Sequence, residues 1–180
     1  MLSKRLNIKT IATVGVMAAT LECGKLVLSF LPNVEVVSIL TALYGYVFGW
    51  AGVLASFVFV MIEPLIWGFG PWFITYLIYW PLLAFVFTCL GRRKVENRWV
   101  ILAIIFGLTV GFGVLSSIID VALYIGINKH YFNNLMLYYI RGIGFYLTQI
   151  CCNAVLFLLI FKPLKDRLTQ IKGRLMIEYM

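Results

Sequence analysis

Charged residues are scarce in this chain. Asp, Glu, Lys and Arg make up 12% of its 180 residues, whereas soluble domains contain about 25%. Apolar residues make up 63% of the sequence, and the mean hydropathy is +0.99. Because soluble domains are only about 45–50% apolar, this composition excludes an ordinary soluble domain. We predict an integral membrane protein.

The sequence also lacks the motifs of common catalytic sites. It has no phosphate-binding P-loop, no H-E-x-x-H motif and no G-x-S-x-G motif. The single histidine is His130, and the four cysteines show no C-x-x-C spacing, so we interpret them as buried free thiols. We expect no catalytic residue, no metal site and no cofactor bound by this chain.

Long apolar runs fill most of the chain, and turn residues separate them. A bilayer core about 30 Å thick requires about 20 helical residues. The predicted spans are Thr10–Leu31, Val34–Trp50, 51–67, Trp72–Leu90, Trp99–Ile127 and Asn133–Phe161, followed by a basic amphiphilic tail at Lys162–Met180. We predict one all-α membrane domain over residues 1–180, built as a bundle of six transmembrane helices.

The basic residues predict the orientation of these spans. With a cytoplasmic N-terminus, 12 of the 15 Lys and Arg residues lie on the inner side, as the positive-inside rule expects. They are Lys4, Arg5, Lys9, Arg92, Arg93, Lys94, Arg98, Lys162, Lys165, Arg167, Lys172 and Arg174. Both termini are then cytoplasmic. The net charge of +8 indicates contact with anionic lipid headgroups rather than with nucleic acid.

A few charged side chains lie at membrane depth, where each costs about 2.5–3.5 kcal/mol and needs a partner or a cavity. They are Glu22, Lys25, Glu63, Asp120 and Arg141, with Glu35 near the outer surface. In the predicted orientation all of them lie in the middle or outer half of the membrane. This one-sided placement predicts a polar cavity that opens to the outside.

Helical spacing groups further residues with these charges. Tyr138, Arg141, Phe145 and Gln149 follow one another by three or four positions and form one stripe. The predicted substrate-binding residues are Glu22, Lys25, Asn33, Glu35, Glu63, Tyr76, Tyr79, Asp120, Tyr138, Arg141, Phe145 and Gln149. The alternative is a structural role, in which polar stripes hold helices together and Glu22 and Lys25 form an ion pair.

The first span carries small residues along one side. Ala12, Gly15, Ala18 and Ala19 allow a second helix to approach closely. That helix belongs either to the same bundle or to a partner protein, and composition does not distinguish the two.

Taken together, these features resemble the substrate-binding S components of energy-coupling factor (ECF) vitamin transporters. The resemblance covers essentially the whole chain. Its elements are the small residues of the first span, L-P-N-V-E at 31–35, Y-G-Y-V-F-G-W-A-G at 44–52 and I-E-P-L-I-W-G-F-G at 62–70. In the family the first span usually carries Ala-x-x-x-Ala. Here Val16 replaces the second alanine after Ala12, and Gly15-x-x-x-Ala19 is the nearest substitute.

This resemblance implies a specific function. S components bind a vitamin from outside, dock through the first span onto a membrane coupling (T) subunit, and topple to release the vitamin inside. Two separate ATPase subunits use ATP and Mg²⁺ to power the cycle, so this chain is expected not to be an enzyme. The expected location is the plasma membrane of a bacterium.

The resemblance also indicates a ligand. The E-C-G-K, L-P-N-V-E-V-V and I-E-P-L-I-W-G-F-G segments are similar to cobalamin-specific S components. A queuosine precursor, pantothenate or a pyrimidine are alternatives. A stand-alone proton-coupled transporter, with Glu22, Asp120 or Glu63 carrying protons, is the competing class of function.

Overall fold

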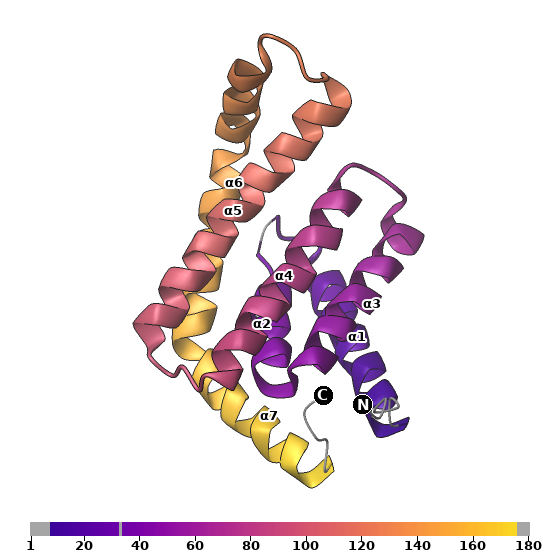
Figure 1. The fold of residues 1–180 in the computed structure, drawn as a ribbon, viewed down its shortest axis with the longest axis vertical. Helices are drawn as coiled ribbons and strands as arrows, with labels where there is room; N and C mark the ends of the chain where they lie inside the picture. The colour runs from indigo at the N-terminus through magenta and orange to yellow at the C-terminus, as the bar shows by residue number, and fades with distance from the viewer. Residues whose placement is uncertain (1–7, 33, 176–180) are drawn as a thin grey trace, which may run out of the picture.

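The computed structural model describes residues 8–32 and 34–175, and these residues fold into seven α-helices (Figure 1). The helices are α1 (Ile8–Leu28), α2 (Val37–Phe48), α3 (Trp50–Trp67), α4 (Trp72–Arg92), α5 (Arg98–Tyr124), α6 (Tyr131–Leu159) and α7 (Phe161–Leu175). Within this described part the all-α prediction is confirmed.

Five of the described helices, α1, α3, α4, α5 and α6, are long and apolar enough to cross a membrane. The second predicted span, Val34–Trp50, is different. It contains α2, whose 12 residues rise about 18 Å and cannot cross a core of about 30 Å. Gly49, at a φ of 63°, ends this helix and begins α3 at once. The prediction therefore placed a full span where the structure has a short helix.

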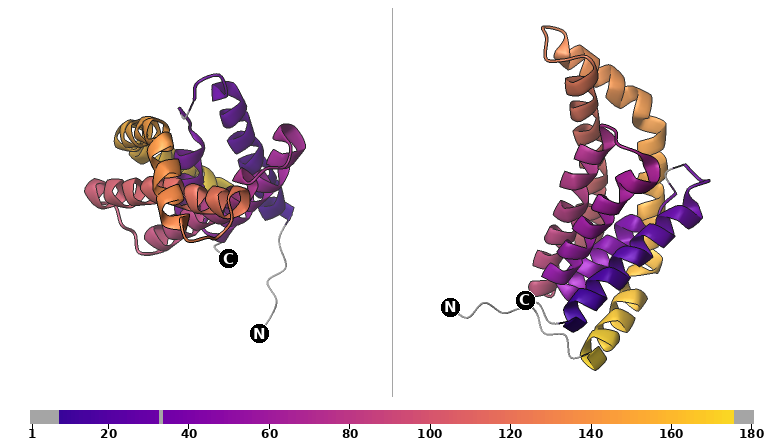
Figure 2. Two further views of the ribbon diagram at one scale, coloured as in Figure 1. Left: turned by 90° about the horizontal axis from the view of Figure 1, so that it is seen from above. Right: turned by 90° about the vertical axis from the view of Figure 1, so that its right-hand side faces the viewer.

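The helices run alternately up and down, so their connections gather at two ends (Figures 1 and 2). We call the end with the α4–α5 loop and α7 the basic end, because Arg92, Arg93, Lys94 and Arg98 lie in or beside that loop. The α1–α2, α3–α4 and α5–α6 connections lie at the opposite end, which we call the loop end. This separation of charge follows the pattern that the sequence predicted.

The short helix α2 occupies the interior of the bundle. All of its residues except Leu40 are buried, and it contacts α1, α3, α4, α6 and α7. Two glycines allow this close packing. A Cβ on Gly45 would lie 2.2 Å from the carbonyl oxygen of Ala84, and one on Gly91 would lie 2.1 Å from that of Tyr46. Helices α2 and α4 are therefore in backbone contact at both positions.

Gly45→Ala is expected to lower the free energy of unfolding by about 1–3 kcal/mol, because the added methyl group collides with rigid backbone. Denaturant titration of the detergent-purified protein measures this change. Gly107→Ala is the matched control, because a Cβ on Gly107 meets nothing within 4 Å. That variant is expected to unfold at the same denaturant concentration or higher, since alanine favours a helix. Equal destabilisation of the two variants would contradict the packing described for α2 and α4.

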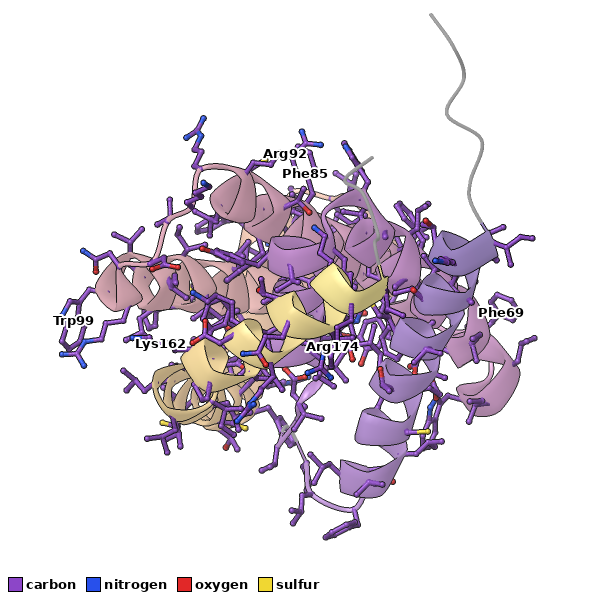
Figure 3. The ribbon with its side chains drawn as sticks, turned by 90° about the horizontal axis from the view of Figure 1, so that it is seen from below. Phe69, Phe85, Arg92, Trp99, Lys162 and Arg174 are labelled. Atoms are coloured by element: carbon purple, nitrogen blue, oxygen red, sulfur yellow. The ribbon has the colours of Figure 1, made fainter. Side chains whose placement is uncertain are left out.

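Helix α7 crosses the basic end of the bundle (Figures 1 and 3). It begins with the ring of Phe161 stacked on Phe157, with ring centroids 5.4 Å apart. Near its other end, Lys172 Nζ donates a hydrogen bond of 2.7 Å to the carbonyl oxygen of Val47. Burial lowers the pKa of Lys172 to about 8. The described part of the predicted basic tail, up to Leu175, is thus a helix that is fixed to the bundle and covers the C-terminal end of α2.

The four cysteines are free thiols. Cys89 and Cys152 are partly buried, but Cys23 and Cys151 are exposed on α1 and α6. The expectation of buried thiols is wrong for these two, because an apolar membrane helix turns part of its surface to lipid and not to the protein core.

A charged and aromatic cavity at the loop end

A cavity of about 370 Å³ opens where the α1–α2 loop meets the ends of α3 and α4. Its lining comes from six helices, α1 to α6, and the α1–α2 loop, so residues far apart in sequence meet there. The lining residues are Lys25, Leu28, Ser29, Leu31, Pro32, Val34, Glu35, Val37, Glu63, Trp67, Trp72, Tyr76, Trp80, Phe112 and Gln149. This volume lies at the small end of the range of small-molecule sites, about 300–1,000 Å³.

An ion pair lies in the cavity wall. Lys25 Nζ on α1 donates a hydrogen bond to Glu63 Oε2 on α3, and the Glu63 side chain is fully buried. Three aromatic rings surround the same ammonium group: the Tyr76, Trp67 and Trp72 ring centroids lie 4.8, 5.5 and 5.8 Å from Nζ. Lys25 is therefore held by a carboxylate and by cation–π contacts together. The structure pairs Lys25 with Glu63, whereas the sequence suggested a pair with Glu22.

Glu22 adds a second carboxyl group beside this pair. It lies one turn before Lys25 on α1, is buried, and interacts with both Lys25 and Glu63. Among the described residues, Glu63 Oε1 and both carboxyl oxygens of Glu22 have no hydrogen-bond partner. Buried acceptors of this kind are costly unless a donor reaches them. Glu63 lies in the cavity wall with this oxygen covered, so a bound N–H or O–H group would reach it only after a small shift of the lining side chains.

Glu35 fixes the opposite wall of the cavity. Its carboxylate accepts a hydrogen bond of 2.8 Å from the Ser38 backbone N–H and another from the Ser38 hydroxyl. This contact caps the N-terminus of α2, where a negative charge is favourable. Gln149 Nε2 on α6 donates to Glu35 Oε1 at 3.4 Å. Burial raises the pKa of Glu35, and the hydrogen bonds from Ser38 and Gln149 oppose that rise.

An aromatic wall closes the cavity on the side of α4. Trp72, Tyr76 and Trp80 follow one another at four-residue spacing, and neighbouring ring centroids are 5.2 and 5.6 Å apart. Phe112 on α5 joins them, 6.2 Å from Tyr76 and 4.8 Å from Tyr79. These edge-to-face contacts make a rigid apolar surface. The cavity therefore combines an aromatic wall with a charged wall.

The structure brings together part of the predicted binding set. Lys25, Glu35, Glu63, Tyr76 and Gln149 line the cavity. Glu22 and Tyr79 are buried next to lining residues. The prediction for Asn33 falls outside the described residues. Four further predicted residues do not line the cavity: Asp120, Tyr138, Arg141 and Phe145.

Those four residues lie nearer the tip of the α5–α6 hairpin, which extends beyond the other helices (Figure 1). Two polar contacts of these residues lie within a single helix. Ser116 Oγ donates to Asp120 Oδ2 at 3.5 Å, and the Arg141 guanidinium lies 5.9 Å from the Tyr138 ring centroid. Helical spacing places residues on the same face of a helix. It does not show at which height along the bundle another helix packs against that face. Their predicted contact with a ligand stays a prediction.

Sequence reasoning missed two tryptophans of the cavity. Trp67 and Trp72 stand beside a turn, and residues in that position are usually anchors at the membrane surface. In the structure both line the cavity and face Lys25. The four-residue spacing of Trp72, Tyr76 and Trp80 was the available signal, since it places all three on one face of α4.

Comparison with known proteins finds no matching family model, no matching curated protein and no matching solved structure. The function therefore has to be inferred from the cavity and from the surfaces of the helices around it.

The predicted docking face on α1 is exposed at three of its four residues. Ala12, Gly15 and Ala19 are exposed, and α1 lies at the edge of the bundle, packed on α2 and α3 (Figure 2). Ala18 is buried against the bundle, with 1% of its surface exposed. The prediction is wrong for Ala18. The four residues are spaced by three, three and one positions, so they spread around the helix and do not all lie on its exposed side. The exposed strip is thus Ala12, Gly15 and Ala19.

Proposed function

We propose that this chain is the substrate-binding subunit of an ECF-type vitamin importer in a bacterial plasma membrane. The cavity at the loop end carries this proposal. It has the size of a ligand site, it combines a charged wall with an aromatic one, and it lies at the opposite end of the bundle from the basic end. With the basic end cytoplasmic, the cavity faces outside, where an import subunit must collect its ligand.

The cavity also narrows the chemistry of the ligand. A partly aromatic molecule fits the wall of Trp72, Tyr76 and Trp80, and its N–H or O–H donors match the carboxyl groups of Glu63 and Glu35, which both line the cavity. A volume of about 370 Å³ favours a compact nutrient such as a queuosine precursor, a pyrimidine or pantothenate. Cobalamin, the ligand that the sequence favoured, is several times larger and would require the α1–α2 loop to open.

In this proposal the energy comes from other proteins. A T subunit docks on the exposed strip of α1, two ATPase subunits hydrolyse ATP with Mg²⁺, and the chain topples to deliver its ligand. The strip of Ala12, Gly15 and Ala19 supports such a contact because small side chains let a partner helix approach closely.

Gly15→Leu is expected to leave ligand binding unchanged but to reduce uptake at least about tenfold, because the larger side chain holds the partner helix away. The bundle tolerates the change, since a Cβ on Gly15 meets nothing within 4 Å. Uptake is measured in liposomes that contain this chain, the T subunit and both ATPases. Gly107→Leu, at an equally open and exposed position on α5, is the matched control and is expected to transport normally.

The same liposomes test the competing function. The cluster of Glu22, Lys25 and Glu63 is the observation that favours a stand-alone proton-coupled transporter, because carboxyl groups at membrane depth are typical of proton carriers. Uptake by the purified chain alone, driven by a proton gradient, would overturn our proposal. Uptake that requires the ATPase subunits and ATP supports it.

A further inference from the structure

A second cavity lies at the basic end, where α5 begins and α6 meets α7. Its volume is about 190 Å³. Arg98 at the start of α5 and Lys162 and Lys165 at the start of α7 lie at its polar edge. Its walls are apolar side chains of α5, α6 and α7, among them Ile101 and Leu158. The site is separate from the cavity at the loop end and shares no residue with it.

The charges of this cavity favour an anion. One of its three cations is used internally: Lys165 Nζ donates to Glu96 Oε1 at 2.6 Å and also pairs with Asp166 at 3.3 Å. The hydrogen bond from Lys165 lowers the pKa of Glu96, so this carboxyl group stays ionised. Glu96 is the one acidic residue of the lining, and the lining residues together carry a net charge of about +2 at neutral pH. Arg98 and Lys162 are both exposed and can face a ligand.

The N-terminus of α5 adds a fixed positive potential at the same place. Arg98 is the first residue of the helix, and the Asn97 side chain caps it by accepting a hydrogen bond of 2.9 Å from the Trp99 N–H. The aligned peptide dipoles of a long helix favour a phosphate group at this end. The guanidinium group of Arg98 lies 5.1 Å from the centroid of the Trp99 ring, which orients it beside the cavity.

The apolar part of the cavity borders an exposed face of α6. Phe157 and Phe161 form its stacked aromatic floor, with planes 14° apart. Leu158 is 48% exposed, although it lies within the span formed by α6. Trp99, which is 64% exposed, and Lys162 lie toward the same edge of the basic end (Figure 3). An exposed Trp beside basic residues marks the depth of lipid headgroups.

We propose that this cavity is a binding site for one anionic phospholipid. Its phosphate lies between Arg98 and Lys162 at the start of α5, and an acyl chain follows Ile101 and Leu158 into the bilayer. A basic pocket between membrane helices is the setting in which anionic headgroups bind. The bound lipid connects α5, α6 and α7, and it therefore stabilises the position of α7 across the basic end.

Thermal unfolding of the delipidated protein in neutral detergent tests this site. Phosphatidylglycerol is expected to raise the melting temperature by about 5 °C. Phosphatidylcholine and inorganic phosphate at equal concentrations are expected to raise it by less than about 1 °C. A full effect of inorganic phosphate would identify a simple anion site, and a full effect of phosphatidylcholine would identify an apolar groove without headgroup selection. Either result overturns the proposal.

Paired variants separate this site from general surface attraction. Arg98→Gln/Lys162→Gln is expected to lose more than half of the shift that phosphatidylglycerol causes. Arg93→Gln/Lys94→Gln, which removes the same charge from the neighbouring α4–α5 loop, is expected to keep it. Leu158→Trp keeps both cations but fills the apolar groove, and it is expected to lose the shift as well. The proposal would be overturned if phosphatidylglycerol raised the melting temperature equally in all three variants. It would also be overturned if both charge variants lost the same share of that rise.

Discussion

Lys25→Met is expected to lower the free energy of unfolding by about 3 kcal/mol, one of the two largest effects of a single substitution in this chain. The change removes the cation that pairs with Glu63, whose side chain is fully buried. Breaking a buried ion pair from one side costs about 3–5 kcal/mol, because the remaining charge has no partner. We expect the lower end of that range because 24% of the Lys25 side chain is exposed. Denaturant titration in detergent measures the loss.

Two further variants establish the cause of that loss. Lys25→Met/Glu63→Leu removes both partners and leaves apolar groups, so it is expected to regain more than half of the lost stability. Lys129→Met removes an exposed lysine from the α5–α6 loop and is expected to change stability by less than about 0.5 kcal/mol. A Lys25→Met protein as stable as the wild type would show that this ion pair contributes nothing to the fold.

Trp72→Ala is expected to weaken ligand binding by about 10- to 100-fold, the other large effect. Trp72 forms part of the aromatic wall, and loss of its buried area on a ligand is worth about 1.5–3 kcal/mol. The fold is expected to persist, because Trp72 is only partly buried. Titration calorimetry with the nutrient that co-purifies with the wild-type protein measures the change.

The controls for this prediction use residues away from the cavity. Trp99→Ala removes an exposed tryptophan at the basic end and is expected to leave the affinity unchanged. Arg141→Ala is the sharper control. Its position in a polar stripe predicts a ligand contact, whereas a ligand held within the cavity does not touch Arg141, so a ligand site in the cavity requires unchanged affinity in this variant. Weaker binding in Arg141→Ala with normal binding in Trp72→Ala would move the ligand site to the α5–α6 hairpin.

Much of the helical architecture follows from the sequence alone, because membrane helices are specified by the length of apolar runs and by turn residues. The exception is α2. Its apolar sequence is typical of a span, but its length is set by Gly49 and by close contacts of Gly45 with α4, and these contacts are tertiary. Apolar residues buried in protein and apolar residues facing lipid have the same composition, so hydropathy does not distinguish them.

The sequence predicted which kinds of side chain form the candidate site, but it did not predict which individual residues line it. Charges at membrane depth must have partners, and of the five residues that this rule selected, Lys25 and Glu63 line the cavity, whereas Asp120 and Arg141 do not. It does not say which charges meet. Lys25 pairs with a residue 38 positions away instead of Glu22 on its own helix, because α3 brings Glu63 against α1. Trp67 and Trp72 were missed since a cavity and a membrane surface both favour tryptophan near a helix end.

Whether this chain binds a nutrient by itself is best measured by calorimetric titration of the detergent-purified chain, without any partner subunit, against cobalamin, pantothenate, a pyrimidine and a queuosine precursor. One of the three compact compounds is expected to bind with a dissociation constant of about 1 μM or tighter, and Trp72→Ala is expected to weaken this binding. Failure of all four to bind, together with no small molecule that co-purifies in mass spectrometry, would contradict the assignment of this chain as a nutrient-binding subunit.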